Sequence, residues 1–157
     1  MARFLVTGGA GYVGSHIVLA LLDDGHEVVV YDNLRTGHKT AVPPQATFIE
    51  ADLADTTRLN AVLANGPWDG VFHFAALSLV GESMQDPMLY MAANAGLGFG
   101  LIDACVKHGI KRFVFSSTAA LFGSAGSGPI DENTPIDPGS PYGESKYMVE
   151  RALYWAD

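Results

Sequence analysis

The amino-acid sequence predicts an α/β protein built on a doubly wound parallel sheet in three layers. Two observations predict this fold: five short apolar runs alternate with helical patterns along the 157 residues, and each run is continuously apolar. Strands of that kind are buried on both faces, as in a parallel sheet covered by helices on each side. Right-handed crossovers from the first strand then predict the strand order 3-2-1-4-5.

The first strand, Phe4–Val6, runs into a glycine-rich turn and then into a helical pattern that should end at Gly25 in the left-handed conformation. A strand, a glycine turn and a helix in this order build an anion site, because the backbone can approach a phosphate and the helix N-terminus offers unpaired N–H groups. The turn matches the Rossmann dinucleotide fingerprint at two spacings, starting at residue 8 or at residue 9. The glycines of the wider spacing are Gly8, Gly11 and Gly14. A tight turn without a ligand is the alternative, and the position between strand and helix favours a nucleotide cofactor.

The second strand, 27–31, ends at Asp32, eighteen residues after Gly14. Near this spacing a carboxylate binds the adenosine ribose hydroxyls of a dinucleotide. A capping or turn aspartate is the alternative interpretation. Because a carboxylate repels a 2′-phosphate, the sequence predicts NAD in preference to NADP, and Arg35 close by weakens that preference.

The remaining elements repeat the alternation of strand and helix. The predicted strands are 47–53, 71–76 and 111–115. The predicted helices are 58–64, a long helix from residue 86 to about residue 108 with Gly109 as its stop, and a last helix from 142 to 155. Residues 36–45 and 123–139 are predicted loops. Small residues around Asn94 make the long helix thin, which predicts that another element packs closely there.

Composition excludes several functional classes. Seventeen acidic and nine basic residues leave a net charge of −8, which argues against non-specific binding to nucleic acid or to an anionic membrane. Cys105 is the single cysteine and stands in an apolar helical context, so neither a disulfide nor a chemical role is expected. The five histidines lack metal-ligand spacing, so no metal is expected, and His73 fits a hydrogen-bonded core residue. Without a recognisable leader or a membrane-length apolar run, a soluble cytoplasmic protein is expected.

Tyr142 and Lys146 are four residues apart on the last predicted helix and therefore share one face. A phenol has a pKa near 10, and a nearby ammonium or an oxidised nicotinamide stabilises its anion. Such a phenol can act as a base near neutral pH, with Thr118 holding and relaying the substrate proton. An ordinary surface pair is the alternative, and the preceding nucleotide-binding pattern favours catalysis.

Taken together, these motifs resemble the extended short-chain dehydrogenase/reductase family and, within it, the nucleotide-sugar 4-epimerases. The resemblance covers the whole chain. The matching motifs are T-G-G-A-G-Y-V-G-S-H at 7–16, V-V-Y-D-N-L at 29–34, F-H-F-A-A at 72–76, L-V-G-E-S at 79–83, F-V-F-S-S-T-A-A at 113–120, D-E-N-T-P at 131–135 and S-P-Y-G-E-S-K at 140–146.

The resemblance implies a role for each matching position. It implies that Tyr12 and Val13 lie against the pyrophosphate, that Asp32 and Asn33 hold the adenosine ribose, and that Asp52 and Leu53 flank the adenine. It implies that the stretch from Phe74 to Ser78, with Ala75 and Ala76, runs beside the nicotinamide half, and that Asn94 helps to bind the cofactor. It implies that Thr118, Tyr142 and Lys146 are the catalytic trio, that the last two also contact NAD, and that Thr118 and Tyr142 contact the sugar.

The implied reaction is the interconversion of UDP-glucose and UDP-galactose by oxidation and re-reduction at C4 of the sugar, with NAD retained. Tyr142 would take the proton of the 4-hydroxyl. A UDP-sugar is therefore the implied substrate and a homodimer the implied assembly. Other nucleotide-sugar 4-epimerases, acting on UDP-glucuronate or UDP-N-acetylhexosamines, remain alternatives, as does a non-catalytic NAD-binding module.

Two stretches depart from the family pattern. Residues 95–98 replace a usual Val-x-Gly-Thr run, and residues 121–123 replace a commoner Val-Tyr-Gly. The chain also resembles the nucleotide-sugar 4,6-dehydratases, but Ala119-Ala120 stands where these carry Asp-Glu, so the acid/base pair for water elimination is missing. Dehydration is therefore not expected.

Length is the remaining difference from the resembled family. Its members continue for about as many residues again, so residues 1–157 are expected to be an incomplete NAD-binding Rossmann domain, with the UDP-sugar-binding domain outside this chain. The isolated chain is expected to fold around five strands, to self-associate through an exposed edge and not to turn over substrate.

Overall fold

The computed structural model describes residues 1–123 and 128–157, so part of the predicted loop 123–139, residues 124–127, lies outside the described residues. The chain forms two compact units. Unit 1 comprises residues 1–75 and 100–116, and unit 2 comprises residues 76–99 and 117–157. That residues 1–157 act as one nucleotide-binding domain stays a prediction.

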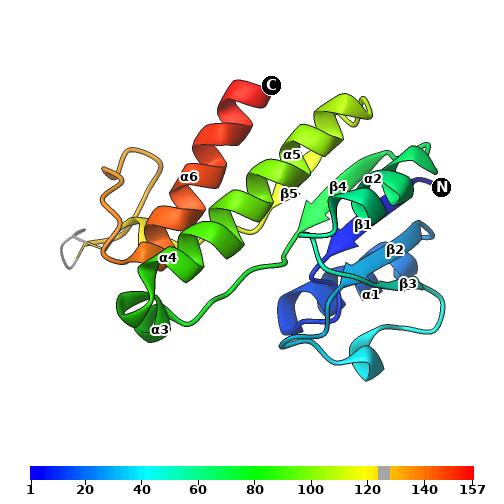
Figure 1. The fold of residues 1–157 in the computed structure, drawn as a ribbon, viewed down its shortest axis with the longest axis horizontal. Coiled ribbons are helices and arrows are strands. Elements are labelled where there is room, and N and C mark those ends of the chain that lie inside the picture. The colour runs from blue at the N-terminus through cyan, green and yellow to red at the C-terminus, as the bar shows by residue number, and fades with distance from the viewer. Residues whose placement is uncertain (124–127) are drawn as a thin grey trace. The chain divides into compact units, whose positions relative to one another are not determined.

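Unit 1 contains a five-stranded parallel sheet in the order β3-β2-β1-β4-β5 (Figure 1), which confirms the predicted order. The strands are β1 (Arg3–Thr7), β2 (Glu27–Asp32), β3 (Thr47–Glu50), β4 (Gly70–His73) and β5 (Phe113–Phe115). The last three are shorter than predicted. After β4, for example, the N–H groups of Phe74 and Ala75 both donate to the carbonyl of Thr7, at 2.8 and 3.1 Å, so the chain leaves the ladder there.

One face of the sheet packs against α1 (Tyr12–Asp23) through a cluster of four fully buried valines. These are Val6, Val18, Val28 and Val30. The helix ends as predicted, with Gly25 at a φ of +78° and its N–H donating to the carbonyl of Leu22 at 2.9 Å. Between β2 and β3 the chain is loop-like, apart from the short 3-10 turn η1 (Lys39–Ala41).

The opposite face is covered by α2 (Thr56–Ala64), because the β3–β4 crossover runs in the reverse direction to the β1–β2 crossover (Figure 1). Asp55 caps this helix by accepting from the N–H of Arg58 at 2.9 Å, so it begins two residues earlier than predicted. Leu59 and Leu63 of α2 are buried. Leu5 and Val29 alternate with the valine cluster along β1 and β2, Val71 of β4 pairs with Leu5, and all three are buried.

Unit 2 is helical. It contains α3 (Val80–Gln85), α4 (Pro87–Tyr90), the π-helical turn η2 (Met91–Gly96), the start of α5 (Leu97–Lys107), the 3-10 turn η3 (Ala119–Leu121) and α6 (Pro141–Ala156). The predicted long helix is present from residue 87 to 107, but the π turn interrupts it and α3 precedes it without having been predicted. Asp86 and Ser140 cap α4 and α6 by accepting from the N–H groups of Leu89 and Gly143, both at 3.1 Å.

The helical stretch Pro87–Lys107 is long and apolar enough to cross a bilayer by length and composition alone. The expectation that no run approaches this length is therefore wrong. A core helix passes the same test, and Leu101, Ala104 and Cys105 of this stretch are buried inside the protein.

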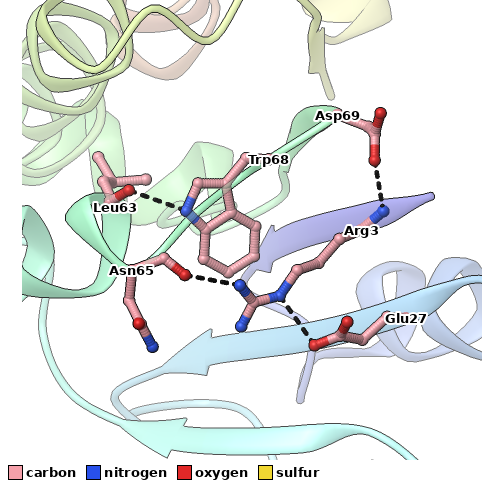
Figure 2. Close-up of polar contacts among 6 residues, drawn as sticks. All are labelled: Arg3, Glu27, Leu63, Asn65, Trp68 and Asp69. Carbon is pink, nitrogen blue, oxygen red and sulfur yellow. Dashed lines mark hydrogen bonds and ion pairs between the residues drawn. The ribbon is translucent and has the colours of Figure 1, made fainter.

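At the amino edge of the sheet, Arg3 joins three separate segments (Figure 2). Its Nε lies 2.8 Å from Oε1 of Glu27, its Nη1 donates to the carbonyl of Asn65 at 2.6 Å, and its guanidinium lies 4.4 Å from the centroid of the Trp68 ring. The backbone N–H of Arg3 also donates to Asp69 at 2.7 Å. These contacts tie the starts of β1 and β2 to the loop before β4.

Candidate functional site

In unit 1 the glycine turn is packed backbone against backbone. Gly8 has a φ of +74°, and a Cβ at this position would overlap the backbone of Phe74 and Ala75. A Cβ on Gly14 would overlap the carbonyl of Gly8 and lie 2.9 Å from the Cα of Gly9. Larger residues would therefore push the turn, the first helical turn of α1 and the end of β4 apart. The conformation predicted from the glycine spacing depends on these two residues.

The N-terminus of α1 follows directly from this turn. Gly11 is its N-cap, and the first helical bond runs from the N–H of Ser15 to the carbonyl of Gly11 at 2.9 Å. The N–H groups of the residues between them precede that bond and point out of the helix end. Tyr12 and Val13 are exposed at 84% and 54%. This arrangement leaves donors and the positive end of the helix dipole for an anion.

Asp32, at the end of β2, is hydrogen-bonded to the glycine turn through its carboxylate. Its Oδ2 accepts from the N–H of Ala10 at 3.0 Å and its Oδ1 accepts from the N–H of Leu34 at 2.8 Å. The carboxylate is 8% exposed. Since each carboxylate oxygen can accept more than one hydrogen bond, these contacts leave acceptor capacity for a ribose hydroxyl.

Asn33 and Asp52 form a polar pair beside Asp32. The amide of Asn33 donates to Oδ2 of Asp52 at 2.7 Å, and the N–H of Ala54 donates to Oδ1 at 2.8 Å. The Ala54 N–H first and the Asn33 amide second hold the pKa of the Asp52 carboxyl below its usual value. Asp52 stands two residues beyond β3 and not within a strand as predicted, because the turn to Ala54 starts there. The neighbouring Leu53 is buried.

The segment predicted to run beside the nicotinamide belongs to both units. Phe74 and Ala75 are half-buried in unit 1, whereas Ala76 and Ser78 lie in unit 2. In unit 2, the Asn94 side chain forms two hydrogen bonds with the backbone of Leu77. Its Oδ1 accepts from the Leu77 N–H at 2.8 Å, and its Nδ2 donates to the Leu77 carbonyl at 3.0 Å. Asn94 is thus placed to shape this segment through its backbone.

Asn94 also connects η2 to α6. Its Nδ2 donates to Oγ of Ser145 at 3.1 Å, and Ser145 donates in turn to the carbonyl of Tyr142 at 2.7 Å. Asn94 is 3% exposed and Ser145 is fully buried. The close packing predicted around Asn94 is therefore present, and its partner is the helix that carries Tyr142 and Lys146.

Lys146 follows Tyr142 by one turn of α6, on the same face, and is 3% exposed. Burial lowers the pKa of the Lys146 ammonium to about 8. Tyr142 is half-buried. Thr118, at the start of η3, accepts from the N–H of Ala120 at 3.1 Å through Oγ1, and its hydroxyl proton remains available to a further acceptor.

The structure therefore collects the predicted residues into two groups. In unit 1 it brings together the glycine turn, Tyr12, Val13, Asp32, Asn33, Asp52, Leu53, Phe74 and Ala75; in unit 2 it brings together Ala76, Ser78, Asn94, Thr118, Tyr142 and Lys146. Sequence reasoning missed Ser145 and Tyr90, which contacts the Tyr142 ring. The position of Ser145 between Tyr142 and Lys146 could have identified it from the sequence, whereas no sequence pattern indicated Tyr90.

Two residues without a predicted chemical role behave as predicted. His73 is 2% exposed, and its Nδ1 lies 2.7 Å from Oγ1 of Thr7, as expected for a core histidine. Cys105 is buried, and burial raises the pKa of its thiol to about 12. Among residues 1–123 and 128–157, no group of three or more metal-ligating side chains is found.

Comparison with known proteins bears directly on these two groups. The model of the NAD dependent epimerase/dehydratase family matches residues 4–157. A UDP-glucose 4-epimerase from Lacticaseibacillus casei is 49% identical over 152 residues, which cover 97% of this chain and 46% of that protein.

Solved structures agree in fold and in extent. The UDP-Glc/GlcNAc 4-epimerase from Campylobacter jejuni matches with a TM-score of 0.95 and 38% identity, covering 99% of this chain and 49% of that one. The UDP-glucose 4-epimerase from Brucella ovis in complex with NAD matches with a TM-score of 0.94 and 40% identity, covering 98% and 47%. The chain thus spans about half the length of the relatives it matches.

Proposed function

The chain belongs to the NAD-dependent epimerase/dehydratase family, and we propose that it is the NAD-binding part of a UDP-glucose 4-epimerase. The proposal is supported by relatives of that name at 42–49% identity across nearly the whole chain. The single observation that carries the chemistry is the placement on α6 of Tyr142 one helical turn before the buried Lys146, on the same face.

The residues of unit 1 fit the cofactor of this family. The close backbone packing that Gly8 and Gly14 allow holds the turn at the N-terminus of α1, where the helix N–H groups would bind a pyrophosphate. Asp32, at the end of β2, would accept from the ribose hydroxyls, which would favour NAD over NADP. When bound, NAD supplies the acceptor and donor of hydride.

The residues of unit 2 supply the proton chemistry. Tyr142 would accept the proton of the sugar 4-hydroxyl and return it once C4 is reduced again. The Lys146 ammonium, buried one helical turn after Tyr142 on the same face, would stabilise the negative charge that develops on the phenol oxygen during proton transfer. Thr118 would relay this proton: its Oγ1 would accept the proton of the sugar 4-hydroxyl while its own hydroxyl proton passes to the Tyr142 oxygen. Asn94 and Ser145 would fix the backbone on which Tyr142 is mounted.

The identity of the sugar nucleotide is the more specific part of the proposal. UDP-glucose and UDP-galactose are the proposed substrates, and UDP-N-acetylhexosamines are the second candidate because the Campylobacter jejuni relative is described as a UDP-Glc/GlcNAc 4-epimerase. UDP-glucuronate is a further candidate from sequence resemblance. Ala119-Ala120 after Thr118 argues against 4,6-dehydration. A homodimer and a cytoplasmic location are proposed for the native protein.

The test is an epimerisation assay on the native protein that carries this chain. UDP-glucose, UDP-N-acetylglucosamine and UDP-glucuronate are supplied separately, and the 4-epimers are separated by chromatography. Formation of UDP-galactose is expected. NAD binding with no epimer from any of the three sugars would instead indicate a non-catalytic NAD-binding module.

A further inference from the structure

Tyr90, the last residue of α4, is fully buried and lies against the proposed catalytic tyrosine. The rings of Tyr90 and Tyr142 are nearly perpendicular, at 88°, with their centroids 6.3 Å apart. This is the edge-to-face geometry that aromatic pairs prefer. The pairing joins residues 52 positions apart in the sequence, and both belong to unit 2.

The hydroxyl of Tyr90 is held at two points. It donates to Oε2 of Glu82 at 2.6 Å and accepts from the N–H of Leu79 at 3.0 Å. A buried phenol with donor and acceptor both engaged has one orientation. The Tyr90 ring is therefore a fixed surface, anchored to α3 through Glu82 and to the preceding segment through Leu79.

Tyr142 is constrained differently. Ser145 holds its carbonyl, which fixes the backbone but leaves the side-chain torsions free. The Tyr142 ring is only half-buried, so its orientation depends on the contacts that its ring makes. The edge-to-face contact with Tyr90 is such a restriction, because rotation of the Tyr142 ring away from 88° loses it.

We propose that Tyr90 is a positioning residue: its ring sets the orientation of the Tyr142 phenol, and its hydroxyl ties that orientation to α3 and to Leu79. The inference rests on the proposed role of Tyr142 in proton transfer. Misplacing a reacting group by about 1 Å costs on the order of 10²-fold in rate. Substrate affinity does not depend on that placement to the same degree, so kcat should respond more than KM.

The test compares two substitutions of Tyr90 in the native protein. Tyr90→Leu removes the ring and should lower kcat by about 10²-fold while KM changes less than about threefold. Tyr90→Phe keeps the ring and loses only the hydroxyl anchor, so it should lower kcat by only about three- to tenfold. Tyr147→Phe is the matched control, since Tyr147 lies on the same helix about 140° around its axis from Tyr142 and should leave kcat unchanged.

A second readout does not require turnover. With 13C-labelled tyrosine, the resonance of Tyr142 is identified by its loss in Tyr142→Phe, and it should shift in Tyr90→Leu and to a smaller extent in Tyr90→Phe, but not in Tyr147→Phe. If the native protein epimerises none of the sugars, the proposed function fails, and this spectrum alone decides the positioning role. An unchanged Tyr142 resonance in a folded Tyr90→Leu protein overturns the inference, even if stability falls. If Tyr90→Leu does not fold, Tyr90→Phe decides by the same criterion.

Discussion

The two units hold their candidate functional residues by opposite means. In unit 1 the glycine turn depends on side chains that are absent, since a Cβ on Gly8 or Gly14 would overlap backbone atoms. In unit 2 the site depends on side chains that hold other side chains, as Asn94 holds Ser145. Larger side chains should therefore disrupt the glycine turn of unit 1, and truncated side chains should disrupt the contacts of unit 2. Substitutions of the first kind should mainly weaken binding of the cofactor, and those of the second kind should mainly slow turnover of the sugar.

The largest expected effect is on turnover. Tyr142→Phe in the native protein should lower kcat by at least about 10²–10⁴-fold, because a positioned proton transfer is lost. The NAD dissociation constant should change by less than about threefold. Isothermal calorimetry and the epimerisation assay measure the two quantities on the same preparation. Near-normal epimerisation by the Phe variant would remove Tyr142 from its proposed role.

The next effect is on cofactor binding. Gly14→Val should weaken NAD by about 10³-fold, equivalent to about 4 kcal/mol, because its side chain would displace the carbonyl of Gly8. Gly100→Ala is the matched control: Gly100 lies in α5 with open space around its Cβ position, so alanine should keep NAD affinity and add up to about 1 kcal/mol of stability. Equal NAD affinities in the two variants would show that the cofactor does not use the turn.

The third prediction concerns pH. Burial lowers the folded-state pKa of Lys146 to about 8 from the ordinary value of 10.5, so the unfolded chain binds more protons between these values. The free energy of unfolding should therefore rise from pH 8 to pH 10.5, relative to Lys146→Met, by about 3 kcal/mol. Below pH 8 the cost of the buried charge is constant. Urea unfolding of both proteins at pH 7.5 and 10 measures the difference, and parallel pH profiles would contradict it.

A smaller effect concerns cofactor selectivity. Native Asp32 should make NAD bind at least about tenfold tighter than NADP, equivalent to about 1.4 kcal/mol, because its carboxylate repels a 2′-phosphate. Asp32→Ala should reduce the ratio to less than about threefold. Calorimetric titration with both cofactors checks this, and an NADP preference in the native protein would exclude the ribose role of Asp32.

The smallest effect is expected at the amino edge of the sheet, which lies at the opposite end of β1 from the glycine turn. Arg3→Met should lower the free energy of unfolding by about 1–2 kcal/mol, since it removes a charge-assisted hydrogen bond and the contact with Trp68. NAD affinity should not change, because the cofactor belongs to the carboxyl edge of a parallel sheet. Thermal denaturation with and without NAD measures both; a loss of NAD affinity would show that the two edges are coupled.

Much of unit 1 could be predicted from local patterns. Continuous apolar runs predict buried strands, and the strand order follows from right-handed crossovers. The end of α1 at Gly25 was predictable because a left-handed residue after a helix is most often glycine. Strand ends were predicted less well, since Phe74 and Ala75 leave the ladder for a contact with Thr7 that no local pattern encodes.

The sequence by itself determined which residues are candidates for chemistry: a glycine turn with an aspartate eighteen residues after its last glycine, and a tyrosine one helical turn before a lysine. These signals depend on spacing along one element, which the backbone geometry of a strand or helix fixes. Only the tertiary structure decided how that chemistry is held. The bond between Asn94 and Ser145 and the ring of Tyr90 against Tyr142 join residues about 50 positions apart. Contacts of this kind arise from packing between elements, and packing is a property of the folded chain.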